Sequence, residues 1–409
     1  MARKSVTNSV LLQRDFFAGF IIVVNAFSWY FPLYLFFESA LESTFLLVAF
    51  GVQCVAAVSS AVVGTALVER FPSRDAFLSV WMFVGVIGST SMVMLEAFNA
   101  AYILLVSFLL GISLGLGFPS CLAYFGDYSA GENMGRLAGI TFFASCLCIF
   151  FVSLLLSFST LVVGALILAA WRGIGLFLFL LARPKGDHRK ENTIQVAYRS
   201  VLLNRSFLLY LVPWTMFCLV NFLERPALTI FFGEDFTSFM LIAEFGIGSF
   251  AALIGGWFAD SVGRKRVVIF GFIILGVAYA VLGLFSNVIL SWYFHLILDG
   301  FAWGIFLLMF YLVIWAELAG NRIKEKYYLM GVLPFIISSY LQILFTPYVT
   351  QIDISAAFSF ASFFLFLAVL PLLYAPETLP EKKIELRRLR KYVEKAKEVR
   401  ERREEEKSI

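Results

Sequence analysis

Charged residues are scarce in this sequence. Asp, Glu, Lys and Arg make up 15% of the 409 residues, whereas a soluble domain has about a quarter. Hydrophobic residues make up 61%, and the mean hydropathy is +0.87. A soluble protein of this length could not bury so many apolar side chains away from water. The composition therefore predicts an all-α integral membrane protein that has membrane lipid as a partner.

Residues and motifs for enzyme chemistry are also scarce. The sequence has two His and five Cys, and every Cys falls in an apolar segment. Cys146 and Cys148 are two positions apart on one predicted helix and so point to different faces. There is no phosphate loop of the type GxxxxGK[ST], no HExxH and no GxSxG. We therefore expect no metal site, no cofactor, no enzyme activity and no ATP-driven pump.

Long apolar segments are abundant, and we interpret twelve of them as helices. Each has about 18 or more mostly apolar residues, enough to cross a hydrocarbon core of about 30 Å. The predicted helices span Asp15–Phe36, Thr44–Val68, Asp75–Leu95, Ala100–Tyr124, Leu137–Phe158, Thr160–Leu181, Ser206–Phe232, Phe236–Ala259, Val267–Phe285, Val288–Ala316, Tyr327–Thr350 and Ser355–Tyr374.

Basic residues gather on one side of the predicted helices. Of the 32 Lys and Arg residues, only Arg172 and Arg225 lie within spans; the others lie near the N-terminus, in alternate loops, in the linker or in the tail. The charged residues in the loops on the other side are all acidic. The positive-inside rule therefore predicts a multi-pass protein of the cell membrane with both termini in the cytoplasm. The net charge of +4 reflects this asymmetry and does not indicate nucleic-acid binding.

Features of the first half recur in the second half at a shift close to 190 residues. Such a repeat indicates two pseudo-symmetric six-helix bundles. The repeated features are Gly64 and Gly256, Asp127 and Glu317, and Gly111-x3-Gly115 and Gly300-x3-Gly304. The predicted domains are an N-terminal bundle (1–181), a cytoplasmic linker (182–205), a C-terminal bundle (206–374) and a charged helical tail (375–409).

The stretch Gly255–Arg266 (GGWFADSVGRKR) is a short polar loop between two apolar spans. Asp260 can accept hydrogen bonds from backbone N–H groups at a helix start. Gly263 permits a tight turn. Three consecutive basic residues, Arg264, Lys265 and Arg266, favour the cytoplasmic side.

This loop resembles the signature loop of the major facilitator superfamily, the twelve-helix secondary transporters, at its position between helices 8 and 9. The copy between helices 2 and 3 is degenerate in this chain. It keeps Gly64, Arg70 and Arg74, but Val68 stands where the family has Asp, and Glu69 is a candidate substitute. The loops after helices 4 and 10 also resemble the family and contain Asp127, Arg136 and Glu317.

The tail begins with Pro376-Glu377-Thr378, a motif that resembles the same position in sugar-porter branches of the family. Farther on, Leu386, Leu389, Val393 and Ala396 share one helical face. This spacing predicts a tail helix that is either solvated or bound to anionic headgroups.

Ionisable residues inside the spans are candidates for transport chemistry, because each is costly within a bilayer. Glu244 and Asp299 lie at comparable depth in predicted helices 8 and 10, and His295 lies one turn before Asp299. We treat all three as proton-coupling candidates, with substrate binding or structural pairing as the alternatives.

Candidates in the first half are mostly neutral. Asn25 and Trp29 share a face of helix 1, and Gln53 on helix 2 is nearly the repeat counterpart of Glu244. We expect these three to line the substrate cavity or to form hydrogen bonds between helices. Arg172 on helix 6 either binds an anionic group of the substrate or has a structural role.

Glu224 and Arg225 lie near the outer end of helix 7. The resemblance implies an outer gate, and a simple interfacial ion pair is the alternative. Pro226 follows directly and is expected to break the helix there.

The sequence thus predicts a monomeric secondary active transporter that moves a small organic solute by alternating access. Proton coupling is expected, and efflux is favoured over uptake. A sugar or small organic acid uptake permease is the nearest alternative. A non-transporting membrane sensor or scaffold and a lipid translocase are alternatives of other classes.

Overall fold

The computed structural model describes residues 14–41, 43–97, 99–129, 133–183 and 194–379, together with 385, 389, 392, 393, 396 and 397. Over these residues the secondary structure is helical, apart from one isolated β-bridge between Ile194 and Arg322. Twelve of the helical stretches are long and apolar enough to cross a membrane. The predicted all-α, twelve-helix membrane fold is therefore confirmed. Most of the predicted tail helix lies outside the described residues.

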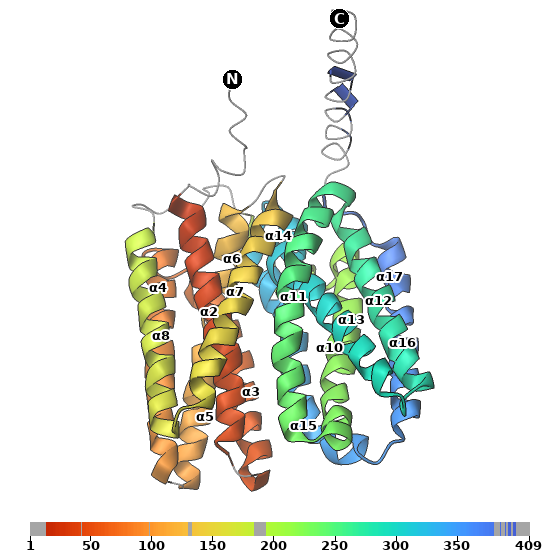
Figure 1. The fold of residues 1–409 in the computed structure, drawn as a ribbon. Helices are drawn as coiled ribbons and strands as arrows, with labels where there is room; N and C mark the ends of the chain where they lie inside the picture. Colours follow the sequence, from red (N-terminus) through yellow and green to blue (C-terminus); the bar gives the residue numbers. More distant parts are fainter. Residues whose placement is uncertain are drawn as a thin grey trace, which may run out of the picture.

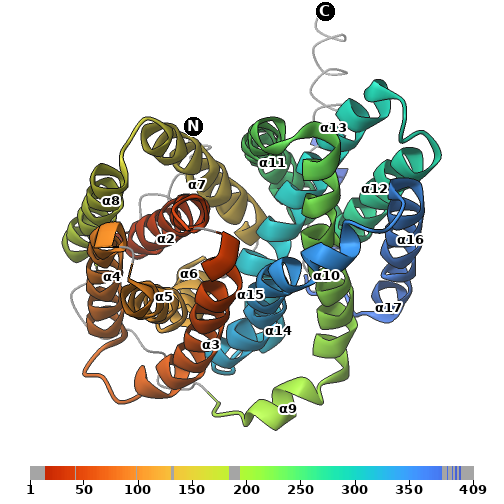
Figure 2. The same cartoon turned by 90° about the horizontal axis from the view of Figure 1, so that it is seen from below.

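The helices form two bundles that stand side by side (Figures 1 and 2). The first bundle contains α2 (Arg14–Ser39), α3 (Ser43–Leu67), α4 (Arg74–Ser91), the 3-10 helix η1 (Met92–Ala97), α5 (Ala100–Gly115), α6 (Phe118–Tyr128), α7 (Met134–Ser157) and α8 (Leu161–Ala182). The second contains α10 (Arg205–Phe232), α11 (Glu234–Val262), α12 (Arg264–Leu284), α13 (Ile289–Leu307), the π-helix η2 (Leu308–Val313), α14 (Ile314–Ala319), α15 (Lys324–Val349), α16 (Ile354–Leu367) and α17 (Val369–Tyr374). The short helix α9 (Tyr198–Leu202) precedes the second bundle.

Large apolar side chains cover the outside of both bundles. Val55, Phe151, Phe177 and Phe363 are each more than half exposed, as lipid-facing residues are. Several helices begin at a polar N-cap, whose side-chain oxygen accepts a hydrogen bond from a backbone N–H of the first turn. These N-caps are Ser73, Asn99, Thr160, Asn204 and Asp353.

The prediction that Pro226 breaks its helix is wrong. Helix α10 continues through Pro213 and Pro226 to Phe232. Within a bilayer, a broken helix would leave backbone groups without partners, so a proline is accommodated inside the span. An unpredicted interruption separates α5 from α6 at Gly117. A Cβ at Gly117 would lie 2.2 Å from Cγ of Trp81, whose indole N–H donates to Ser113 O at 2.7 Å.

The two bundles meet mainly where α7 packs against α11 and where α3 and α6 pack against α15, with smaller contacts of η2 to α6 and α7. Helices α7 and α11 nearly touch through their backbones, because a Cβ at Gly256 would lie 2.3 Å from Gly135 O. We call the end of the bundles where α8 ends at Ala182 and α10 begins at Arg205 the linker end. The opposite end, where α2 ends at Ser39, is the far end.

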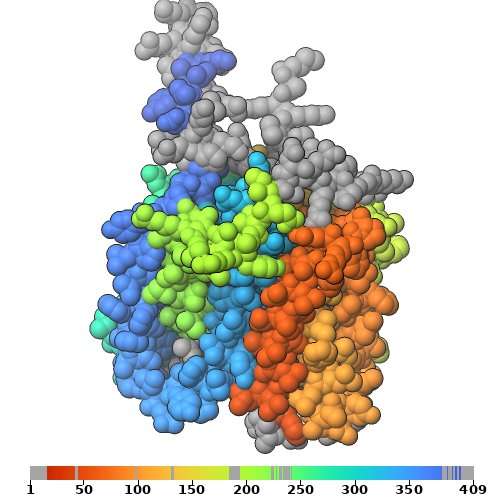
Figure 3. Space-filling model, turned by 180° about the vertical axis from the view of Figure 1, so that it is seen from behind, coloured from red at the N-terminus to blue at the C-terminus, as the bar shows by residue number. Residues whose placement is uncertain are grey.

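The chain segment before α9 crosses between the bundles at the linker end. The Ile194 N–H donates to Asn321 O at 3.1 Å, and the Ile323 N–H donates to Ile194 O at 3.3 Å. The Tyr198 and Thr65 hydroxyl groups are 2.5 Å apart, so the start of α9, directly after this segment, contacts the first bundle. Figure 3 shows this yellow-green segment over the ends of blue α15 and orange α3.

Candidate functional site

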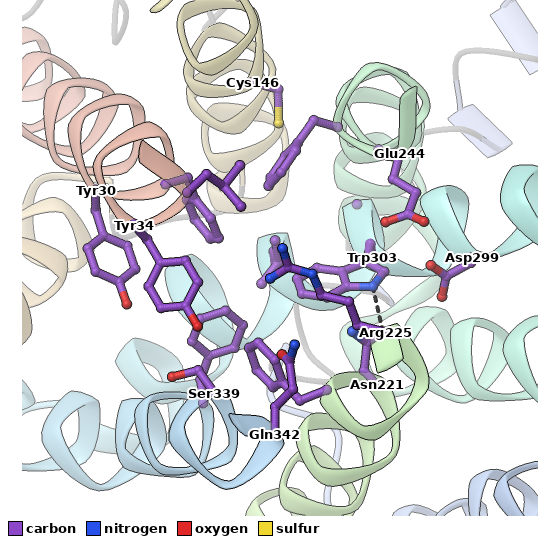
Figure 4. A pocket seen from close by; sticks show the side chains of 18 of the residues that line it. Tyr30, Tyr34, Cys146, Asn221, Arg225, Glu244, Asp299, Trp303, Ser339 and Gln342 are labelled. Atoms are coloured by element: carbon purple, nitrogen blue, oxygen red, sulfur yellow. Dashed lines mark hydrogen bonds between the residues drawn. The ribbon is translucent and has the colours of Figure 1, made fainter. Parts of the chain in front are cut away.

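A pocket lies between the two bundles. Its walls come from α2 and α7 of the first bundle and from α10, α11, α13 and α15 of the second (Figure 4). The empty volume, including space open to solvent, is about 950 Å³. Aromatic rings form much of the wall, among them Tyr30, Phe31, Tyr34, Phe245, Trp303 and Phe335.

Two carboxylates lie on one side of this pocket. Glu244 comes from α11 and Asp299 from α13, and Figure 4 shows their carboxyl groups pointing toward one another. The two helices are in near backbone contact one turn away, since a Cβ at Gly304 would lie 2.2 Å from Gly248 O. The sequence placed both acids at similar depth, and the structure brings them to the same pocket.

His295 lies one helical turn before Asp299 but is not among the residues that line the pocket. Its imidazole is fully buried inside the second bundle, against the rings of Tyr279 (centroids 4.9 Å apart) and Phe358 (6.1 Å). Its ring packs among aromatic side chains of α12 and α16.

Neutral polar groups complete the pocket wall. The Trp303 indole N–H donates to Asn221 Oδ1 at 2.6 Å. The Ser339 hydroxyl donates to Ile336 O at 2.8 Å. Gln342 is 6% exposed, and its Oε1 receives no hydrogen bond from any residue that the structure describes. The hydroxyl oxygen of Tyr34 is likewise buried without a partner in the described part of the chain.

An ion pair joins the two bundles near the far end. Arg225 on α10 approaches Glu38 on α2 to 3.1 Å, and both side chains are about three-quarters buried. Arg225 also lines the pocket, so the pair lies between the pocket and the far end. The side chain of Glu224, the other predicted gate residue, lies outside the described residues.

At the linker end, Asp260 binds the start of α7 in the other bundle. Its carboxylate accepts hydrogen bonds from the N–H groups of Gly135 and Arg136, both at 2.9 Å. As the sequence predicted, an acid at the end of α11 binds backbone N–H groups at a helix start. The Arg264 guanidinium lies 2.8 Å from the same carboxylate, and both side chains are at most 1% exposed. Arg136 is farther away, with its Nε 3.8 Å from Asp260.

The rest of this loop is tied within the second bundle. Gly263 adopts a φ of 119°, the conformation that a tight turn between α11 and α12 requires. Arg264 also contacts Glu317 at 3.1 Å. Glu317 accepts a hydrogen bond from the Thr378 hydroxyl at 2.6 Å, and Glu377 accepts one from the Arg264 N–H at 2.7 Å. The Pro-Glu-Thr segment thus fixes the loop to the start of the tail. Lys265 donates to Leu373 O at 2.8 Å, and Arg266 is exposed.

The corresponding loop of the first bundle is built differently. Val68 is 1% exposed, and its apolar side chain cannot form the hydrogen bonds that a carboxylate forms. Arg74 lies 2.6 Å from Asp127 and 3.0 Å from Glu325 of α15. Asp127 also binds Lys324 of α15. Two side-chain ion pairs, Arg74–Glu325 and Asp127–Lys324, therefore join the bundles here.

Glu69 does not replace the missing Asp. It is exposed and accepts a hydrogen bond from the Gln195 side chain at 3.3 Å, in the segment that crosses between the bundles. Arg70 is also exposed, whereas Gly64 allows close packing, because a Cβ there would lie 1.8 Å from Leu116 O.

Solved structures of transporters have the same arrangement of helices. The proton:xylose symporter XylE superposes with a TM-score of 0.64 at 15% identity, over 92% of this chain and 97% of XylE. The fucose:proton symporter FucP, in its outward conformation, gives 0.68 at 12% identity, over 89% and 100%. The human organic anion transporter MFSD10 gives 0.63 at 14% identity, over 88% and 98%. The chain has the major facilitator superfamily fold. No family model matches the sequence, and no curated protein matches it either.

The polar residues predicted in the first half lie in the core of their own bundle of this major facilitator fold. Arg172 is fully buried, donates to Asn25 Oδ1 at 2.8 Å and stacks between Trp29 and Trp81, with its Cζ 4.7 and 4.3 Å from the ring centroids. Asn25 also donates to Trp171 O at 2.9 Å. Neither these residues nor Gln53, which is 5% exposed, line the pocket described above. In place of lining the cavity, this cluster joins α2, α4 and α8.

Several residues of the site were missed by sequence reasoning. The pocket residues Asn221, Ser339 and Gln342 are isolated neutral side chains within apolar spans, and no motif marks them. Lys324 was counted only among the basic residues of its loop, and Glu325 was not considered. Their adjacency at a helix start, opposite Arg74 and Asp127 in the other half, was the available signal.

Proposed function

We propose that this protein is a secondary transporter that moves a small organic solute across the cell membrane by alternating access. The observation that carries the proposal is the position of the pocket. It lies between the two bundles, and charged contacts join the bundles on both sides of it: Arg225–Glu38 toward the far end, and Asp260 with the two ion pairs of α15 at the linker end. Breaking one set of contacts while the other forms would expose the pocket alternately. The solved transporters of the same fold support this proposal.

Alternating access predicts opposite distance changes at the two ends. Spin labels at Phe17 and Val262 report on the linker end, and labels at Phe158 and Leu284 report on the far end. All four side chains are exposed. The half-buried Cys54 and Cys148 would first be replaced by Ala. Solute or a pH gradient should widen one label pair while it narrows the other. Distances that stay fixed in both pairs under every condition would favour the sensor or scaffold alternative.

We further propose that Glu244 and Asp299 couple transport to protons. Both side chains line the pocket, and a carboxyl group that is exposed alternately to the two sides of the membrane can take up a proton on one side and release it on the other. In proteoliposomes with a trapped pH-sensitive dye, solute should drive proton movement, and Glu244→Gln or Asp299→Asn should abolish it. Unchanged proton movement in both variants would show that coupling resides elsewhere.

We propose export over uptake, because the pocket wall is largely aromatic and aliphatic and suits an amphipathic solute. Vesicles of both orientations would determine the direction. The same vesicles with fluorescent lipids test the lipid-translocase alternative, for which lipid exchange without solute movement is expected.

A further inference from the structure

We propose that the tail binds the surface of the membrane, with its apolar face on the anionic headgroups of the bilayer that holds the bundles. This surface is separate from the pocket, so the proposal goes beyond the transport function. The tail residues that the structure describes are all helical and exposed: Glu385, Leu389, Tyr392, Val393, Ala396 and Lys397.

Four of these residues form an apolar face. Leu389, Tyr392, Val393 and Ala396 are three or four positions apart, so they lie on the same side of the helix. The side chains of Leu389, Tyr392 and Val393 are 60%, 75% and 53% exposed, so the bundles leave this face uncovered. An apolar helix face that the rest of the chain does not cover is favourable only against another surface.

Basic residues border this face on both sides. At 3.6 residues per turn, the sequence places Arg388 and Lys395 along one border and Arg390 and Lys397 along the other. Residues 382–397 contain eight Lys or Arg and only two Glu. Helices that lie on an anionic bilayer have this pattern, because the apolar face enters the headgroup boundary while the basic residues bind the headgroups.

The start of the tail is held beside the membrane. The last span ends with α17 at Tyr374, and the Tyr210 hydroxyl donates to Pro376 O at 2.8 Å. Leu379 is 1% exposed, and Glu385 follows six positions later. Six residues reach at most about 21 Å when extended, so the helix begins close to the headgroup layer. Because the tail is tethered there, a short apolar face meets the lipid at a high effective concentration.

The side of the membrane also favours anionic lipid. The described tail residues lie on the linker-end side of the bundles (Figure 1). The basic loops lie at the same end, and the positive-inside rule predicts that it faces the cytoplasm. The cytoplasmic leaflet has a negative surface potential, which attracts basic segments next to a span.

A second copy of the tail fits this face less well. A coiled coil requires apolar a and d positions over at least about three heptads. In this tail the apolar spacing ends after less than two, since Glu385 lies one turn before Leu389 and Arg400 one turn after Ala396. Pairing would also bring two strongly basic segments together, whereas anionic headgroups compensate their charge.

A spin label at Val393 tests the proposal. The full-length protein, with Cys54 and Cys148 replaced by Ala, is placed in lipid nanodiscs that hold one copy each. Accessibility to oxygen and to a water-soluble nickel chelate reports the depth of the label. In discs of phosphatidylcholine with phosphatidylglycerol, the label should be protected from the chelate. In discs of phosphatidylcholine alone, or in anionic discs at high salt, it should be accessible, because the attraction is weaker or screened.

A second label position controls for general shielding of the tail. Glu398 is nine positions after Leu389 and therefore on the opposite face of the helix. A label there should remain accessible to the chelate in every disc.

Paired variants test the role of charge. With the label at Val393 in anionic discs, Arg390→Gln/Lys395→Gln should lower the ratio of protected to accessible label at least about tenfold, because each basic residue near an anionic surface adds to binding. Glu394→Gln/Glu398→Gln is the matched control. It also converts two charged residues to amides, and it should keep or increase the protection. Both variants should leave the thermal unfolding of the bundles unchanged, since these tail positions lie outside them.

Equal protection in neutral and anionic discs, no protection in either, or an equal loss in the two paired variants would overturn the proposal. Protection that appears only when two copies share a disc would assign the face to a second copy and would overturn it as well. These outcomes leave the transport function untouched, because the label pairs at the two ends of the bundles test it separately.

Discussion

The two signature loops occupy equivalent places in the two halves, yet they join the bundles by different chemistry. The second-half loop uses one carboxylate, Asp260, which binds backbone N–H groups at the start of α7. The first-half loop has Val68 at the equivalent place, and its bundle is joined to α15 by the pairs Arg74–Glu325 and Asp127–Lys324.

This difference separates two ways to make a reversible contact between helices. A carboxylate at a helix start uses N–H groups that have no partner inside the helix, so the acceptor is defined by the backbone. A pair of side chains depends on both partners and can be replaced or exchanged. The second-half contact also shares its acid with the buried Arg264, whereas Asp127 is 32% exposed. We therefore expect the closed linker end to depend more on Asp260 than on any single member of the other network.

Asp260→Ala should have the largest effect. The variant removes one of the carboxylates that neutralise the fully buried Arg264, and breaking such a buried pair costs about 3–5 kcal/mol. It also removes the acceptor of the Gly135 and Arg136 N–H groups. The labels at Phe17 and Val262 should then move apart at the linker end, and transport should be lost. A distance distribution that matches the unmodified protein would show that Asp260 does not hold the bundles together.

Lys324→Met should have a smaller effect, of about 1.5–3 kcal/mol, the range for a hydrogen bond to a charged group. Asp127 keeps Arg74 as a partner in this variant, so only one of the two pairs between the bundles is lost. The same label pair measures the change. The exchange Asp127→Lys with Lys324→Asp should be less damaging than either single reversal, which double-mutant analysis can determine.

Val68→Asn tests whether the first-half loop can adopt the chemistry of the second. Val68 is 1% exposed, so a polar amide here would be buried in an apolar environment and should cost about 1–2 kcal/mol. Thermal unfolding of the purified protein would measure the loss, with Val68→Ala as the control for lost packing. An increase in stability would mean that the start of α15 is available to a polar side chain after all.

Tyr198→Phe should have the smallest effect. It removes the hydrogen bond to Thr65, worth about 0.5–1.5 kcal/mol, and keeps the ring that Lys326 approaches to 5.2 Å. The labels at the linker end should show a slightly larger open population. An effect as large as that of Asp260→Ala would make the crossing segment the main closure of this end.

Much of the architecture could be predicted from the sequence. Apolar segments long enough for a bilayer specify twelve helices, because the length and the hydropathy of a span are local properties. The sequence predicted that Asp260 binds N–H groups at a helix start, but it did not predict that this helix is α7 of the other bundle. The continuation of α10 through Pro226 could not, because neighbouring helices and lipid decide whether a helix survives a proline.

The pocket could be predicted only in part. Glu244 and Asp299 were found because an acid in an apolar span is conspicuous. Asn25, Trp29 and Arg172 stood out because they are polar groups in apolar spans, yet they bind one another inside the first bundle. A polar side chain in a span satisfies its hydrogen bonds either within a bundle or at the cavity, and its helix position alone does not distinguish these outcomes.

The sequence by itself determined that the protein lies in a lipid membrane, that it has twelve membrane helices and that its two halves repeat. These properties follow from composition, segment length and periodicity. The tertiary structure alone decided which charges meet. Lys324 and Asp127 are 197 positions apart, and Asp260 is 125 from Gly135. Contacts over such separations depend on how whole helices pack, and in this chain close-packed glycines such as Gly135 and Gly256 set that packing.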